Sequence, residues 1–175
     1  ANPLDTPSGK IEIYSEALQT IADTWELDKK DIIRALPVYA QENGGYADAT
    51  PEHPLQMVGY HFKGHVHSSY ASIDVLKQAN RERHLWINPV DADARKLKEG
   101  DTIRVSSDQG TIEVNAHVTP RIIPGTVALD QGAWYDGDKN GVDKGGCINT
   151  LVSGHPSPLA KANPSHTILV DVKKA

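Results

Sequence analysis

Six short strand-like segments follow one another closely between residues 55 and 172, with only two short helical segments among them. Short runs rich in β-branched and aromatic residues, bounded by turn residues, are typical of strands. The expected strands are 55–60, 85–88, 102–106, 111–118, 125–130 and 167–172. Because strands and helices do not alternate regularly, a doubly wound parallel sheet is disfavoured. The pattern favours a compact, mainly β barrel with short helical insertions.

Two helices are expected among these strands, one over 69–78 and one that begins at Pro89. Asn88 is a favourable N-cap residue, and proline suits the first helical position. Acidic residues come early and basic residues late in this second segment, as the helix dipole favours. Gly100 stands where a glycine would end the helix. Further on, residues 108–110 predict a hairpin turn between two strands.

The first 50 residues have a different character from the rest. Residues 10–14 alternate polar and apolar side chains, which predicts a short strand. Ser15 could cap a helix that runs to about Trp25 with one apolar side. We interpret 1–50 as an extension or linker that leans on a neighbouring part of a larger protein, and 51–175 as the barrel.

Length and charge exclude several classes of protein. A chain of 175 residues suits one domain, or one domain with an extension. With 18 basic and 23 acidic residues the net charge is −5, a poor basis for nucleic-acid binding. No apolar run approaches the ~20 residues that span a bilayer. The single cysteine, Cys147, excludes an intramolecular disulfide, a four-cysteine zinc site and a cysteine-ligated iron–sulfur cluster within the chain.

The densest polar feature is the segment 59–70, which follows the first expected strand. It holds three histidines, a lysine and two serines: His61, His65, His67, Lys63, Ser68 and Ser69. Cationic and hydroxyl donors beside free backbone N–H groups suit a phosphate or the edge of a heterocycle. The alternative interpretation is a polar surface loop.

Metal binding is a second hypothesis for the same chain. His61, His65 and His67 could supply imidazole ligands to zinc. The segment that starts at Asp136 mimics the opening of a calcium loop, but it has Asp143 and Cys147 where an apolar residue and a glutamate belong. An independent zinc- or calcium-binding β domain therefore remains the alternative function.

Three further residues have open interpretations. Cys147 has no base near it in sequence, so a small buried thiol is favoured over a nucleophile. Trp134 is either a lid over a pocket or a packed loop residue. In the polar segment 156–167, which is a structural loop by default, Lys161 and Asn163 are plausible donors to an anion or a base edge.

Seven segments, read together and in order, resemble one known module. They are 6–15, 61–70, 86–92, 100–105, 131–134, 145–151 and 157–167. The chain resembles the C-terminal molybdopterin dinucleotide-binding domain of the dimethyl sulfoxide reductase family of molybdenum enzymes. Within the family it looks closest to catalytic subunits of the membrane-anchored, iron–sulfur-containing anaerobic reductases.

The resemblance implies a six-stranded double-psi β-barrel, similar to the aspartate decarboxylase barrel. A self-standing enzyme of decarboxylase type would need a serine after a glycine, and the chain has no such pair. The implied ligand is bis(molybdopterin guanine dinucleotide) molybdenum, covered by this domain from one side. The implied contacts are His61, Lys63, His67, Ser68, Ser69, Asn149, Thr150 and Lys161. The resemblance implies that Asn149 donates a hydrogen bond to the amide edge of the pterin.

The resemblance also implies a place in a larger oxidoreductase. The parent reaction would be the two-electron reduction of an S- or N-oxide in anaerobic respiration. Other domains would supply the metal ligand and the iron–sulfur cysteines, so the chain alone should have no turnover. The expected partners are the preceding domains, an iron–sulfur electron-transfer subunit and a membrane anchor, with no nucleic acid. A periplasmic or membrane-associated location follows from the family alone.

Overall fold

The computed structural model describes residues 2–39, 45–70, 73–77 and 84–175. The chain forms two compact units. We call residues 1–42 with 156–162 the N-terminal unit, and residues 43–155 with 163–175 the barrel unit. The division of domains at residue 50 stays a prediction, because compactness alone does not define a domain.

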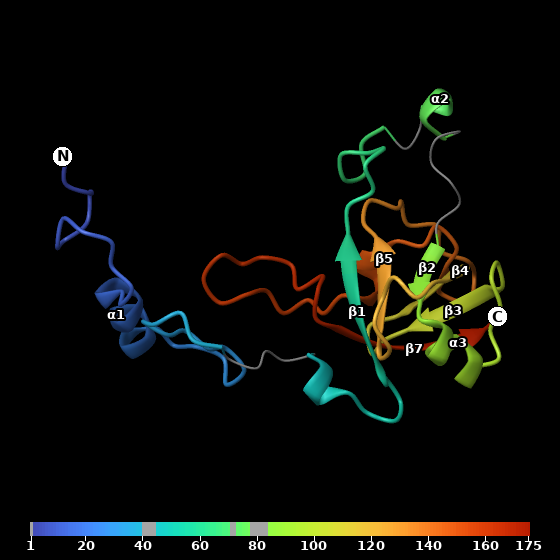
Figure 1. The fold of residues 1–175 in the computed structure, drawn as a ribbon, viewed down its shortest axis with the longest axis horizontal. Coiled ribbons are helices and arrows are strands. Elements are labelled where there is room, and N and C mark those ends of the chain that lie inside the picture. Colours follow the sequence, from blue (N-terminus) through green and yellow to red (C-terminus); the bar gives the residue numbers. More distant parts are fainter. Residues whose placement is uncertain (1, 40–44, 71–72, 78–83) are drawn as a thin grey trace. The chain divides into compact units, whose positions relative to one another are not determined.

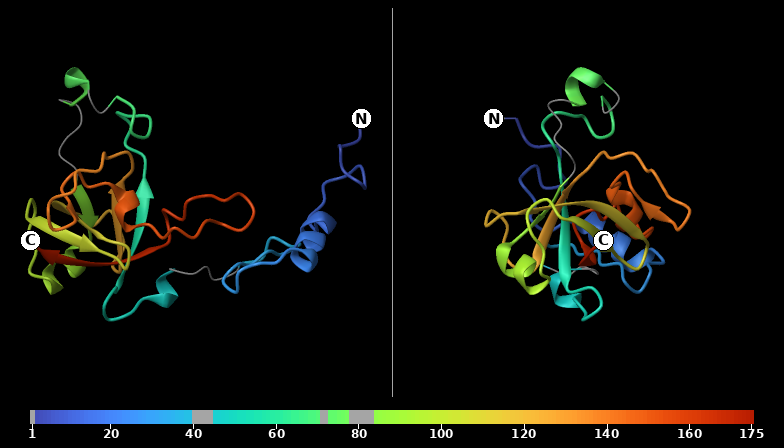
Figure 2. Two further views of the ribbon diagram at one scale, coloured as in Figure 1. Left: turned by 180° about the vertical axis from the view of Figure 1, so that it is seen from behind. Right: turned by 90° about the vertical axis from the view of Figure 1, so that its right-hand side faces the viewer.

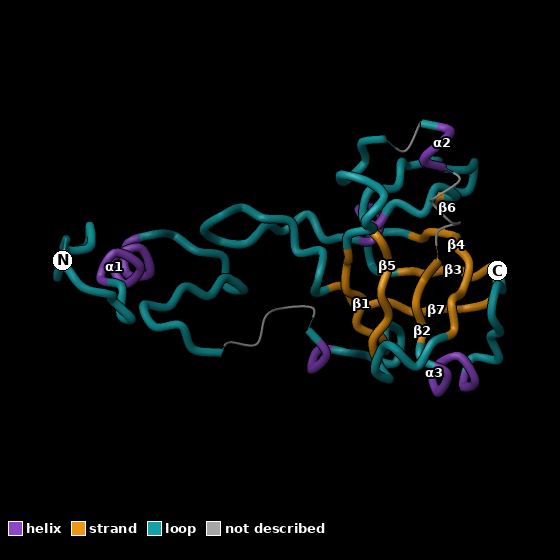
Figure 3. The backbone as a smooth tube through the Cα atoms, turned by 45° about the horizontal axis from the view of Figure 1, so that its top comes forward, coloured by secondary structure: helices purple, strands orange, loops and turns teal. Residues whose placement is uncertain are grey.

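Six strands of the barrel unit close into a ring. In sheet order they are β2 (His84–Ile87), β5 (Thr126–Asp130), β1 (Leu55–Tyr60), β7 (Ile168–Lys174), β3 (Thr102–Ser106) and β4 (Thr111–Val118). A pairing of β2 with β4 closes the ring (Figures 1, 2 and 3). The pairs β1–β5 and β2–β4 are parallel, and the other four pairs of the ring are antiparallel. The predicted six-stranded, mainly β barrel is confirmed.

Alternation along the strands places one face of each in the core. In β4, Ile112, Val114 and Ala116 are buried while the residues between them are not. Leu55 and Met57 of β1 follow the same period of two. Each large apolar side chain removed from water in this way contributes about 1.5–3 kcal/mol. The barrel interior is therefore a packed core, and its chemistry must lie at the ends or on the outer surface.

The α3 helix (Pro89–Ala94) begins as predicted and ends early. The Asn88 side chain accepts a hydrogen bond from the N–H of Val90 at 2.9 Å. The prediction that Gly100 ends this helix is wrong. Lys96 takes the left-handed conformation with φ of 57°, and the N–H of Leu97 bonds back to Ala92. The chain turns there because Leu97 enters the core, where only 4% of it is exposed.

The remaining predictions of local structure have mixed outcomes. The α1 helix (Glu16–Thr24) is confirmed, with its cap at Ser15, but residues 10–14 form no strand. Only α2 (Asp74–Lys77) is helical within the described part of 69–78, and residues 71, 72 and 78 lie outside it. Sequence patterns missed the short strand β6 (Val142–Asp143), which pairs with β4, and two 3-10 turns, η1 (Tyr46–Asp48) and η2 (Ile148–Leu151). Within the described ranges, no helix is both long and apolar enough to cross a membrane.

Candidate functional site

Two loops leave the barrel side by side at the C-terminal ends of β1 and β5. These strands are parallel, and their last residues, Tyr60 and Asp130, are paired (Figure 1). We call residues 61–70 the β1 loop and residues 131–136 the β5 loop. The pairing of Tyr60 with Asp130 places the start of the β1 loop next to the start of the β5 loop. The β1 loop holds six residues that the sequence predicted as metal ligands or hydrogen-bond donors.

The β1 loop carries an exposed lysine, exposed imidazoles and exposed hydroxyls. The side chains of His61, Lys63, His67, Ser68 and Ser69 are all exposed. The rings of His61 and His67 meet edge to face, with centroids 4.9 Å apart. Among the described residues, Lys63 has no ion pair or hydrogen-bond partner. The loop contains no acidic residue, so none of its own carboxylates competes with a ligand for its hydrogen-bond donors.

The β5 loop locks onto the β1 loop. The indole N–H of Trp134 donates to the carbonyl of Ser68 at 3.0 Å. Gly132 has φ of 99°, and a Cβ at this position would lie 2.0 Å from the carbonyl oxygen of His67. Trp134 is 63% exposed, so its ring is not packed into the core. The two loops form one continuous surface because glycine permits this contact of the two backbones.

Gln131 ties three elements together, and the sequence alone did not single it out. Its backbone N–H donates to the carbonyl of Tyr60 at 2.8 Å. Its side-chain Oε1 lies 3.0 Å from Nε2 of His61, and its Nε2 donates to Oγ of Ser165 at 3.1 Å. Only the segment 131–134, one of the seven that carry the resemblance, included this position, because the side-chain partners are 34 and 70 residues distant.

Asp143 is the second residue that sequence reasoning misjudged. It is fully buried, with 0% exposed, and both carboxylate oxygens accept hydrogen bonds. Oδ1 accepts from the N–H groups of Asp136 and Gly145, each at 2.8 Å. Oδ2 accepts from the N–H of Cys147 at 2.7 Å and from the Thr150 hydroxyl at 3.1 Å. The carboxylate organises the segment 136–150 internally, where the calcium-loop comparison treated it as a mismatch.

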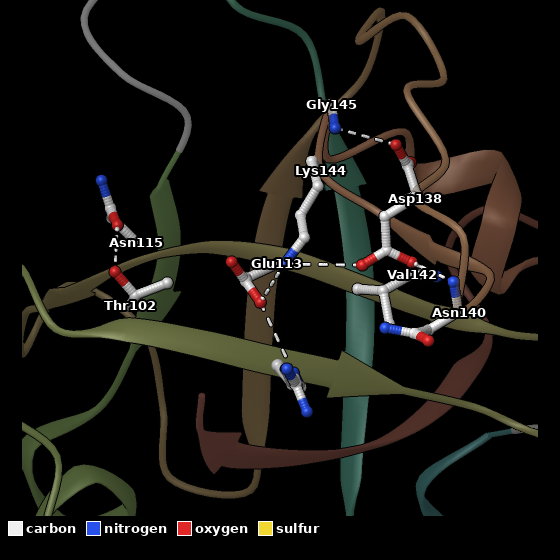
Figure 4. A network of polar contacts seen from close by, with 10 residues as sticks. Thr102, Glu113, Asn115, Asp138, Asn140, Val142, Lys144 and Gly145 are labelled. Carbon is white, nitrogen blue, oxygen red and sulfur yellow. Dashed lines mark hydrogen bonds and ion pairs between the residues drawn. The ribbon is translucent and has the colours of Figure 1, made fainter.

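The same segment is held from outside by an ion-pair network (Figure 4). Lys144 Nζ lies 2.6 Å from Oε2 of Glu113 and 4.0 Å from Oδ2 of Asp138. The hydrogen bond from Lys144 lowers the pKa of Glu113. Backbone N–H donors from Val142 and then Asn140 lower the pKa of Asp138. Both carboxylates are therefore ionised at neutral pH and fix Lys144 on the wall of the barrel.

Asn149 and Thr150 lie on η2. The segment before η2 adjoins the β5 loop, since a Cβ on Gly145 would collide with the carbonyl oxygen of Trp134, and Ile148 of η2 lies against Gly59 of β1. Asn149 is exposed, and its Oδ1 accepts from Nδ2 of Asn163 at 3.3 Å. Its own amide hydrogens have no acceptor in the described part of the chain. Lys161 belongs to the N-terminal unit, and its role stays a prediction.

No arrangement of the described side chains matches the zinc or calcium hypothesis. The described residues contain no group of three or more histidine, cysteine, aspartate or glutamate side chains able to hold a metal ion. His65 turns its Nδ1 to the carbonyl of His67 at 3.3 Å and its ring to Phe62. Cys147 is half-buried, less hidden than the predicted buried thiol. The clustered donors therefore suit an anion and a heterocycle better than a cation.

Comparison with known proteins identifies the family of this chain. Residues 55–169 match the family described as "Molydopterin dinucleotide binding domain". The chain is 55% identical over 175 residues to dimethyl sulfoxide reductase DmsA of Escherichia coli, covering 99% of this chain and 21% of that protein. It is 35% identical over 181 residues to trimethylamine-N-oxide reductase of Haemophilus influenzae, again covering 99% and 21%. The chain thus spans about a fifth of the length of the curated relatives it matches.

A solved structure shows the same fold at low sequence identity. Acetylene hydratase from Pelobacter acetylenicus aligns with a TM-score of 0.79 at 19% identity. The alignment covers 99% of this chain and 24% of that protein. The likeness supports the architecture of the chain and carries no conclusion about its reaction.

Proposed function

The chain belongs to the molydopterin dinucleotide binding domain family, and on that premise we propose that the β1 loop, the β5 loop and η2 together bind molybdopterin guanine dinucleotide. One observation carries the proposal. Cationic, hydroxyl and amide donors from segments far apart in sequence are exposed on adjoining loops at one end of a packed barrel. Such a ligand offers a pyrophosphate and two heterocycles, which need donors of these kinds in fixed directions.

The β1 loop fits the phosphates. Lys63 supplies a mobile point charge, and the hydroxyls of Ser68 and Ser69 supply short donors. His67 supplies a ring N–H group, and an edge-to-face contact holds its ring beside His61, whose Nε2 faces Gln131. Because no carboxylate stands on the same loop, the local field favours an anion.

η2 fits the edge of a heterocycle. The Asn149 amide is fixed by Asn163 through its oxygen, which leaves its N–H groups to donate to a ring carbonyl or nitrogen. Thr150 donates its hydroxyl hydrogen to Asp143, so toward a ligand it can only accept. The role of Thr150 is therefore chiefly to hold η2 in place.

The proposal extends to the parent protein. The bound cofactor would supply two-electron redox chemistry at molybdenum, and the residues described here bind, orient and shield it. The parent reaction would be the reduction of an S- or N-oxide, as the names of the two reductase relatives suggest. A second dinucleotide on the metal, an iron–sulfur subunit, a membrane anchor and a periplasmic or membrane-associated site belong to the same proposal.

The N-terminal unit supports association with other domains of the same polypeptide. The α1 helix buries none of its residues, and Ile11, Ile13 and Trp25 are 84%, 71% and 49% exposed. A contiguous chain segment with so many exposed large apolar side chains is typical of an interface. In the full-length protein, the domains that correspond to the other four-fifths of the relatives would supply the partner surface.

Truncating the ligand-facing side chains of the β1 loop should release the cofactor. In the full-length protein we expect Lys63→Ala and His61→Ala each to speed loss of bound guanine nucleotide by about tenfold, because charge-assisted hydrogen bonds contribute about 1.5–3 kcal/mol. The measurement is guanosine monophosphate liberated by acid per polypeptide after timed dilution. Lys139→Ala, which removes an exposed lysine outside the β1 loop, is the matched control. Wild-type retention in both site variants would refute the assignment.

A further inference from the structure

Gln131 joins the proposed ligand His61 to the framework of the barrel. Its Oε1 faces the ring at 3.0 Å from Nε2, so in this arrangement Nε2 carries the hydrogen and donates. A carbonyl oxygen cannot donate, and the contact therefore selects one tautomer of a neutral imidazole. Nδ1 is then the ring atom left for a ligand. In a protonated ring the same contact leaves the Nδ1 hydrogen for a phosphate.

Gln131 is itself held through both its side chain and its backbone. Its Nε2 donates to Oγ of Ser165, and its backbone N–H bonds to Tyr60 at the end of β1. Gly59 provides the room, because a Cβ there would lie 2.6 Å from the Gln131 Nε2. The carbonyl of Ser165 accepts from the N–H of Gly59 at 3.0 Å, which closes the arrangement. An amide with two engaged ends has little freedom to rotate, so its oxygen stays toward His61.

We propose that Gln131 is a positioning residue: it sets the tautomer and the ring orientation of His61, so that Nδ1 is the edge presented to the bound dinucleotide. The inference rests on the proposed function. It assigns to Gln131 an action through His61 and not through a ligand contact of its own. His61 otherwise has an edge contact with the ring of His67, which restrains the ring but does not choose between its nitrogens.

The test is a double-mutant cycle in the cofactor-loaded full-length protein. Gln131→Leu keeps the approximate shape and removes both hydrogen bonds. Gln131→Glu keeps an acceptor for His61, and its second oxygen can accept from the Ser165 hydroxyl. The variants Q131L, Q131E, H61A and Q131L/H61A are compared by the rate at which bound guanine nucleotide is lost. Gln109→Leu, an exposed glutamine in the β3–β4 hairpin, is the control.

We expect Q131L to speed loss by about fivefold to tenfold, the worth of an ordinary to strong hydrogen bond. Q131E should stay within about threefold of wild type, and Q131L should add less than about twofold in the H61A background. An equal effect of Q131L with and without His61 would overturn the inference, as would a failure of glutamate to rescue. If H61A itself retains the cofactor like wild type, the proposed contact of His61 fails. If H61A loses cofactor fast and Q131L does not, only the positioning role fails.

Discussion

Asp143→Ala will lower the free energy of unfolding of the chain by about 3–5 kcal/mol. The carboxylate is fully buried and accepts from three backbone N–H groups and one hydroxyl. Alanine leaves these four partly buried donors without their acceptor, and each unsatisfied buried group costs about 1–3 kcal/mol before relaxation. The expected loss is therefore a large part of the stability of an ordinary domain.

Urea denaturation of the 175-residue chain measures this loss. Asp108→Ala is the matched control, because its side chain is 86% exposed and its pairing with His53 at 3.5 Å is at the surface. An exposed pair of this kind contributes about 0–1 kcal/mol. Asp143→Asn should fall between the two, since its amide NH₂ would face backbone donors. A loss below about 1 kcal/mol in Asp143→Ala would show that the carboxylate does not organise the segment 136–150.

Gly132→Ala will detach the β1 loop from the β5 loop while the barrel remains folded. An L-residue at φ of 99° is strained, at a cost of about 1–3 kcal/mol. The added Cβ would also lie 2.0 Å from the His67 carbonyl oxygen, so one backbone must move. Because His61 and His67 lie on the displaced loop, we expect cofactor loss in the full-length protein to quicken by at least about tenfold.

Gly141→Ala is the control that separates the cost of an L-residue at positive φ from the steric clash of its Cβ. Gly141 has φ of 79°, and a Cβ there would meet nothing within 4 Å. It should share the conformational cost and keep the cofactor at the wild-type rate. The paired readout is the hydrogen exchange of backbone amides in 61–70, which should quicken in Gly132→Ala only. Equal cofactor loss in the two variants would mean that the contact with His67 has no part in holding the site.

The strands were predictable where the period of two was clear. The ranges 55–60, 102–106 and 111–118 match β1, β3 and β4, because one face of each strand packs in the core and the other does not. The cap at Asn88 was also readable, since it depends on neighbours in the chain. The wrong helix end at Gly100 has a tertiary cause, the burial of Leu97, which overrides the preference for glycine at a helix end.

The candidate site was predictable only in part, and its supporting residues were not. The β1 loop was visible as a cluster of donors in sequence, and the resemblance added Asn149 and Thr150. Gln131 and Asp143 act through partners that only the fold brings near, such as Ser165 and His61 for the first. The failed strand at 10–14 has a similar origin, since alternation predicts a strand only where a neighbouring edge exists to pair with it.

Hydrogen exchange of the full-length polypeptide with and without its cofactor tests the central claim most directly. We expect the cofactor to protect backbone amides in 59–70, 131–136 and 145–150, which are the segments that form the site. The α3 helix follows β2, which runs antiparallel to β5, so it lies at the opposite end of the barrel and is expected to exchange alike in both forms. Protection elsewhere in the protein with no change in these three segments would contradict the account, because it would place the dinucleotide away from the C-terminal ends of β1 and β5.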